Sequence, residues 1–100
     1  MEVLALEHDG PSPQGATAEL LRAEALRVYE LEQAGVVRRT WFRAERPAAV
    51  LLLEVETLED ARAAVSGLPL VAAGVIDLEL VPLAPYPGLA RLWTDAVTGT

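Results

Sequence analysis

The stretch AAVLLLEV, residues 48–55, is apolar at seven of its eight positions, on odd and even residues alike. Successive side chains of a strand point to opposite faces of the sheet, so this strand presents apolar groups to both. A strand with one face in water would instead alternate apolar and polar residues. The stretch therefore predicts a central strand whose second face needs a cover of its own.

The segments around this strand predict the order β-α-β-β-α-β. Strands are expected at residues 2–8, 36–43, 48–55 and 75–81, and helices at residues 18–34 and 57–67. Thr17 and Thr57 have the positions of N-caps, and Gly35 has that of a helix stop. The inner stripes of the two helices are expected to be Leu21, Ala25, Val28 and Leu31, and Leu58, Ala61, Val65 and Leu68.

This order is that of a ferredoxin-like α+β domain with an antiparallel sheet. Right-handed crossovers place the first and third strands at the centre and both helices on one face. We expect the domain to span residues 1–87. Residues 88–100 form a C-terminal tail that is too apolar to be idle, and Tyr86 and Trp93 would anchor it on a neighbouring subunit or on its own.

On this topology the second face of the 48–55 strand lies open, and we expect neighbouring Val3 and Ala5 to extend its apolar patch. Exposing such side chains costs about 1.5–3 kcal/mol each relative to burial. A patch of this kind indicates an interface or a ligand cavity. A second copy packed face to face would cover it, which predicts a homodimer or higher homo-oligomer enclosing a space for a small-molecule ligand.

Composition excludes several function classes. The net charge of −7 argues against nucleic-acid partners and anionic membrane surfaces. The chain has neither Lys nor Cys and a single His, which excludes Schiff-base and thiolate chemistry and a zinc site built on cysteines. We therefore expect no cofactor that a lysine or a cysteine would hold. The first ten residues lack a signal-peptide pattern, which predicts a cytoplasmic protein, and the absence of Asn and Cys fits a thermophile.

Three motifs carry a family resemblance. They are LPL at residues 68–70, IDLELVPLAPYP at residues 76–87, and the spacing of Gly35, Arg38 and Trp41. In this order the chain resembles the muconolactone isomerase-like proteins, from about residue 20 to residue 87. The resemblance implies subunits paired as a dimeric α+β barrel and a cofactor-free enzyme that moves a double bond in a small unsaturated lactone.

The chain departs from the family at four places. One is near the end of the matched region, where Pro85 and Tyr86 stand in place of a basic residue and a His. Residues 47–51 are Pro-Ala-Ala-Val-Leu, without aromatic or amide side chains, where the family isomerase has an aromatic, amide-bearing stretch. Residues 71–73 are Val-Ala-Ala where it has Phe-Pro-Tyr. A lysine of the family's first helix has no counterpart in this chain. The fold follows from the resemblance in spite of these differences, whereas the particular activity does not.

Isomerisation of this kind needs a base, an acid and a donor for the developing negative charge. The resemblance implies Asp77 or Glu79 as the base, Arg38 as the holder of a substrate carboxylate and Trp41 as a flat wall. In the alternative interpretation, Asp77 and Glu79 lie on the solvent-facing side of an edge strand and form ion pairs with Arg38.

His8, at the end of the first strand, is a further candidate for acid–base catalysis, with a surface position at the strand end as its alternative. Two other functions stay open. One is a non-catalytic ligand-binding or assembly module of the same fold. The other is a cofactor-free monooxygenase acting on an aromatic substrate, which requires His8 to point inward.

Overall fold

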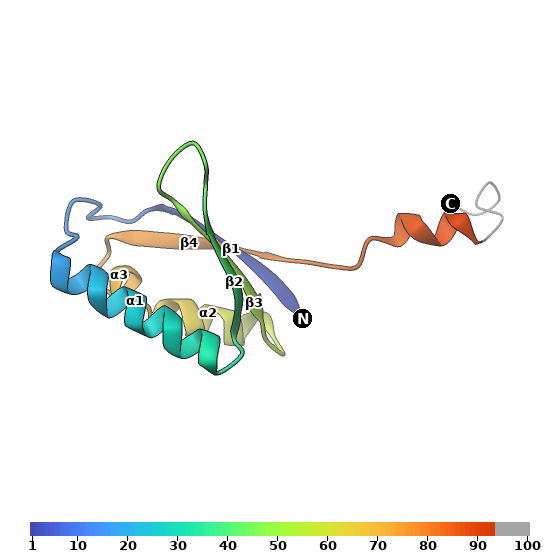
Figure 1. Cartoon of the computed structure of the whole chain (residues 1–100), viewed down its shortest axis with the longest axis horizontal. Helices are drawn as coiled ribbons and strands as arrows, with labels where there is room; N and C mark the ends of the chain where they lie inside the picture. The colour runs from blue at the N-terminus through green and yellow to red at the C-terminus, as the bar shows by residue number, and fades with distance from the viewer. Residues whose placement is uncertain (94–100) are drawn as a thin grey trace.

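The computed structural model describes residues 1–93. Its elements, in chain order, are β1 (Glu2–Asp9), α1 (Ala18–Gln33), β2 (Val37–Phe42), β3 (Ala49–Glu54), α2 (Leu58–Ser66), α3 (Pro69–Ala72), β4 (Ile76–Pro82) and the 3₁₀ helix η1 (Pro87–Leu92). The four strands form one antiparallel sheet in the order β2-β3-β1-β4. The helices α1, α2 and α3 lie on one side of this sheet (Figure 1). The predicted ferredoxin-like α+β arrangement is thus confirmed, with α3 and η1 as unpredicted short elements.

Local sequence signals set the helix ends. The side-chain oxygen of Thr17 accepts a hydrogen bond from the Leu20 N–H at 3.1 Å, and that of Thr57 accepts one from the Asp60 N–H at 3.1 Å. Both bonds satisfy backbone donors that an N-terminal helical turn leaves free. After α1 the chain turns at Gly35, whose φ of +79° is a left-handed conformation that glycine adopts without a side-chain penalty. These caps begin and end the helices close to the predicted positions.

The core lies between the sheet and α2. Its buried residues are Val3, Ala5, Leu31, Val37, Leu51, Leu53, Ala61, Val65, Leu68 and Leu78. Val3 and Ala5 are 0% exposed, so the prediction that they extend the open face of the sheet is wrong. The register explains the error: Val3 pairs with Leu53 and Ala5 with Leu51, and both leucines face the helices.

The open face of the sheet is apolar at its centre. Opposite positions in the ladders place Leu4 beside Leu52 and Val81, and Leu6 beside Val50. These five side chains are half-buried, and the helices lie on the other side of the sheet (Figure 1). We call them the open-face patch. The 48–55 stretch thus divides as its pattern predicts, with Leu51 and Leu53 in the core and Val50 and Leu52 in the patch.

The segment after β4 leads away from the domain and carries η1 at its far end (Figure 1). Tyr86, Leu89, Leu92 and Trp93 are all strongly exposed, Trp93 to 79%. The molecule is consequently elongated, with principal extents of 57 × 29 × 21 Å. Of the expected tail, residues 88–93 are described and residues 94–100 lie outside the described part of the chain.

Candidate functional site

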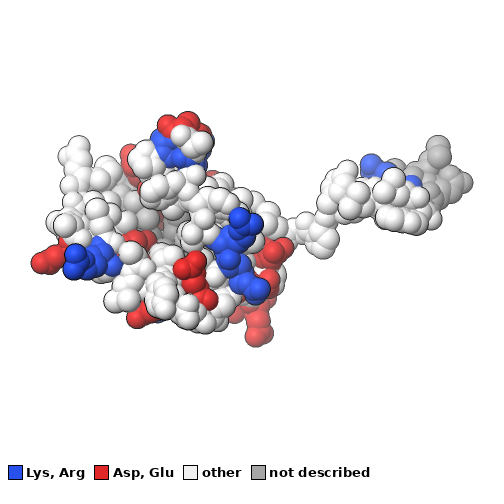
Figure 2. All heavy atoms as spheres, viewed as in Figure 1, with Lys and Arg blue, Asp and Glu red and all other residues white. Residues whose placement is uncertain are grey.

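The sheet and α1 border a half-open cavity of about 790 Å³ on the helix side of the sheet. Its apolar walls include Leu21, Ala25 and Val28 from α1, and Ala49, Leu51 and Leu78 from the sheet. We call it the α1 cavity. Figure 2 shows the surface hollowed between α1 and the β2–β3 hairpin. A mostly apolar concavity of this size is typical of a small-molecule site.

The cavity exists because α1 does not seal the sheet. The main contacts of α1 are with α3 and β2. Of its predicted inner stripe only Leu31 is buried, whereas Leu21, Ala25 and Val28 line the cavity and Leu21 is 52% exposed. The stripe of α2 behaves as predicted, since Ala61, Val65 and Leu68 are all buried. The two helices therefore differ in role, with α2 closing the core and α1 forming a wall.

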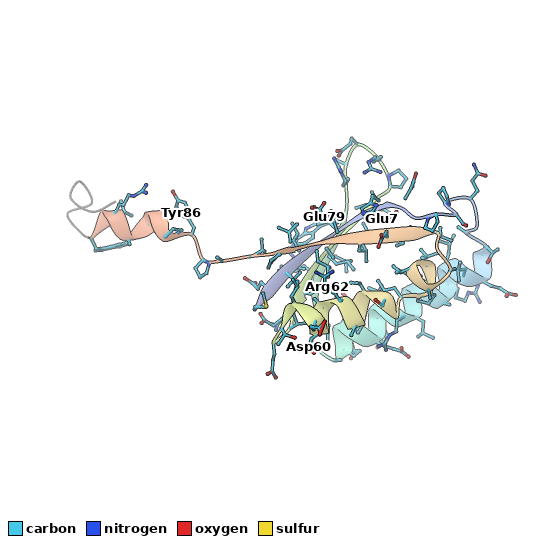
Figure 3. The ribbon with its side chains drawn as sticks, turned by 180° about the vertical axis from the view of Figure 1, so that it is seen from behind. Glu7, Asp60, Arg62, Glu79 and Tyr86 are labelled. Atoms are coloured by element: carbon cyan, nitrogen blue, oxygen red, sulfur yellow. The ribbon has the colours of Figure 1, made fainter. Side chains whose placement is uncertain are left out.

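Two carboxyl groups, Glu7 from β1 and Glu24 from α1, line the α1 cavity. The N–H of Leu70 donates a hydrogen bond to Oε1 of Glu24 at 2.9 Å, and the N–H of Ala49 donates to Oε1 of Glu7 at 2.8 Å. Each carboxyl is thus oriented by a backbone donor on another element. In Figure 3, Glu7 lies on the helix side of the sheet and Glu79 on the opposite side.

Burial raises the pKa of Glu24 above its ordinary value of 4.5. The hydrogen bond from the Leu70 N–H opposes this rise, and the negative charge of Glu7 adds to it. A carboxyl whose pKa is shifted toward neutrality can both accept and return a proton at working pH. Glu24 is therefore the side chain in this cavity best suited to proton transfer.

The structure places three of the sequence-predicted site residues together on the open face of the sheet. Asp77 and Glu79 are exposed on β4, and His8 on β1 lies directly opposite Asp77 in the ladder. None of the three lines the α1 cavity. Within the described residues they face away from the helices, so an enclosed site there would need a cover on this face, such as a second subunit.

The two predicted substrate-binding residues lie at the far edge of the sheet from these carboxylates. Arg38 is exposed at the irregularity in β2, the edge strand opposite to β4. Trp41 borders the α1 cavity, and the Arg39 guanidinium lies 5.0 Å from the centroid of its ring. A single subunit therefore does not bring Arg38 or Trp41 to Asp77 and Glu79.

Sequence reasoning missed both Glu7 and Glu24, although each breaks an apolar pattern. Glu24 is three residues after Leu21 and four before Val28, which places it on the apolar stripe of α1. Glu7 continues the inward alternation of Val3 and Ala5 along β1. A carboxylate at a position where the pattern predicts an apolar residue was the signal that would have identified both glutamates.

Within residues 1–93, His, Asp and Glu side chains form no group of three or more that would hold a metal ion. Over the same residues, no helix has the length and apolar character needed to cross a membrane.

The chain is thus a ferredoxin-like α+β protein with carboxyl groups in an apolar cavity, and comparison with known proteins gives its family. The sequence model of the muconolactone delta-isomerase family matches residues 4–88, so the chain belongs to this family. It is similar to a crystal structure of muconolactone isomerase at 3.3 Å resolution, with a TM-score of 0.72 and 21% sequence identity over 87% of this chain and 92% of that one. No curated protein sequence matches the chain.

Proposed function

We propose that the protein is a cofactor-free isomerase that shifts a double bond in a small unsaturated lactone or related carbonyl compound. Family membership supports the reaction class. The observation that carries the proposal is Glu24, a half-buried carboxyl with a raised pKa that is held by the Leu70 N–H in an apolar cavity. This is the environment that general acid–base catalysis by a carboxyl requires.

In this mechanism ionised Glu24 takes a proton from the saturated γ carbon of an α,β-unsaturated lactone, or from the α carbon of a β,γ-unsaturated one. The electrons of the broken C–H bond pass into a conjugated enolate, whose negative charge lies on the carbonyl oxygen. The same carboxyl then returns the proton at the far end of the conjugated system, so neither oxidant nor cofactor is consumed. The hydroxyls of Tyr29 and Thr40 line the cavity and are the candidate donors to the enolate oxygen.

We also propose that a second copy covers the open-face patch, as the family resemblance implies. The apolar centre of this face supports such pairing, because an isologous interface buries the same patch on both subunits. The exposed Tyr86, Leu89, Leu92 and Trp93 support docking of the tail on a neighbouring subunit. Pairing would also enclose His8, Asp77 and Glu79, which form the alternative catalytic group.

Two further functions remain as alternatives. A non-catalytic ligand-binding module would keep the α1 cavity and show binding without turnover. The monooxygenase alternative requires an inward His8, and the geometry gives it no support because His8 is exposed and does not line the cavity.

Turnover of unsaturated lactones by carboxyl-to-amide variants tests the proposal. Glu24→Gln keeps the oxygen that accepts from Leu70 and removes the titration, so kcat should fall by about 100-fold or more, the usual loss when a general base is removed. Asp77→Asn and Glu79→Gln are matched controls and should keep most of the activity. Undiminished turnover in Glu24→Gln would eliminate Glu24 as the base, and a selective loss in Asp77→Asn or Glu79→Gln would move the site to the open face.

A further inference from the structure

The charged side chains that line the α1 cavity indicate which kind of ligand it can bind. Four acidic residues contribute to the cavity lining: Glu7, Asp9, Glu24 and Glu32. The chain has eight basic residues, all Arg, and none of them lines the cavity. We take the α1 cavity as the ligand-binding site, and the charge of its carboxyl groups affects which ligands bind there.

Three of the eight arginines have a partner of their own. Arg27 pairs with Glu30 and Arg43 with Glu45 in exposed ion pairs. Arg39 stacks on Trp41. A substrate carboxylate in the α1 cavity would thus find no cation among the lining side chains, and binding would place an additional negative charge in an apolar space beside Glu7 and Glu24.

We infer that the ligand of the α1 cavity is an unsaturated carbonyl compound that carries no carboxylate. The inference rests on the proposed function for the reaction class, but it concerns binding and is tested by binding. It fits the acid–base chemistry, because an anion held near Glu24 would oppose the ionised form that must accept the proton. The apolar walls formed by Leu21, Val28 and Leu51 would contact the hydrocarbon part of such a ligand.

Muconolactone and its methyl ester are a matched pair of probes that differ by one charge at neutral pH. Their dissociation constants are measured with the full chain by isothermal titration calorimetry, under conditions where turnover does not affect the reading. The ester is expected to bind more tightly than the acid by roughly tenfold or more, the order of effect that uncompensated charges produce in a partly buried site. An ester analogue with an added ammonium group should bind at least as tightly as the ester, because its positive charge would lie near the carboxyl groups of the lining.

Reversing the charge of a residue at the rim of the α1 cavity tests whether the preference for the ester over the acid arises in this cavity. Glu32 is exposed near the C-terminal end of α1 and lines the cavity, so Glu32→Arg should be tolerated and should place a cation where the helix dipole favours one. The substitution is expected to reduce the preference for the ester, measured as the dissociation constant of the acid divided by that of the ester, by roughly threefold or more. Glu30→Arg is the control on the same helix, because Glu30 does not line the cavity, and its ratio should equal that of the wild type.

Each outcome decides the inference. Equal or tighter binding of the acid, weaker binding of the ammonium analogue than of the ester, binding of neither probe, or the same ratio in Glu32→Arg and Glu30→Arg would overturn it. Tight, selective binding of the ester without conversion would support the inference and count against the proposed isomerase activity. If the acid is converted and binds at least as tightly as the ester, the proposed isomerase activity is supported and the inference about the ligand is contradicted.

Discussion

Replacing Leu52 by Asp tests whether a second copy covers the sheet. Leu52 lies at the centre of the open-face patch, opposite Leu4 on β1 and opposite Arg39 on β2. Its side chain is half-buried in the single subunit, so only part of its surface remains to be covered by a partner. Because it faces away from the core, Leu52→Asp should keep the domain folded while it disrupts pairing.

The size of the effect follows from this partial burial. Full burial of a leucine contributes about 1.5–3 kcal/mol, so the exposed half contributes about 1 kcal/mol per subunit and about 2 kcal/mol per two-fold dimer. Since about 1.4 kcal/mol corresponds to a tenfold change, loss of this contribution alone raises the dimer dissociation constant about 30-fold. The two buried carboxylates that the substitution introduces would raise it further.

Sedimentation velocity over a range of protein concentrations measures this constant. The control is Leu26→Asp, which introduces the same charge at a leucine of α1 that is 58% exposed and lies outside the core clusters. It should leave the dimer dissociation constant unchanged. A wild-type protein that sediments as a monomer at every concentration would refute the pairing, and so would equal dissociation constants for the wild type and Leu52→Asp.

Two further predictions concern stability. The raised pKa of Glu24 means that the folded state binds more protons than the unfolded state between pH 4.5 and that raised pKa, so the free energy of unfolding should fall as pH rises through this interval. Urea titrations should show a shallower fall for Glu24→Gln, and parallel curves would contradict this assignment. A methyl group at Gly10 would lie 2.4 Å from the carbonyl oxygen of Gly74 and would separate strands joined by the 3.0 Å hydrogen bond from the Gly10 N–H to the Val75 oxygen. Gly10→Ala should therefore cost about 1–3 kcal/mol in urea denaturation, whereas Gly67→Ala, with no atom nearer than 3.7 Å, should be nearly neutral, and equal effects would contradict the close approach.

The order of the elements was predictable because local signals agreed with one another. The caps at Thr17 and Thr57, the stop at Gly35 and the alternation along β4 all act within a few residues of the chain. The helix α3 was missed because four residues, Pro69–Ala72, are too few to show a helical period.

The orientation of β1 was not predictable from its own sequence. Residues 3–6 read Val-Leu-Ala-Leu, which is apolar on both faces, so the pattern does not state which face turns inward. Only pairing with β3 decides it, and pairing places Val3 and Ala5 against the helices and leaves Leu4 and Leu6 outside. This error hid Glu7, whose side chain lies on the same, inward-facing side of β1 as Val3 and Ala5.

The contrast between the two long helices favours a ligand-binding function over a purely structural one. In α2 the apolar stripe is buried, as a domain that serves only assembly would require of both helices. In α1 the stripe residues Leu21, Ala25 and Val28 border a cavity, and Glu24 stands among them with its charged form destabilised by burial. Both features reduce stability, and local departures from good packing of this kind concentrate at functional sites. Because the open-face patch lies on the other side of the sheet, pairing through that patch would not cover these residues, and they support the proposed small-molecule ligand of the α1 cavity.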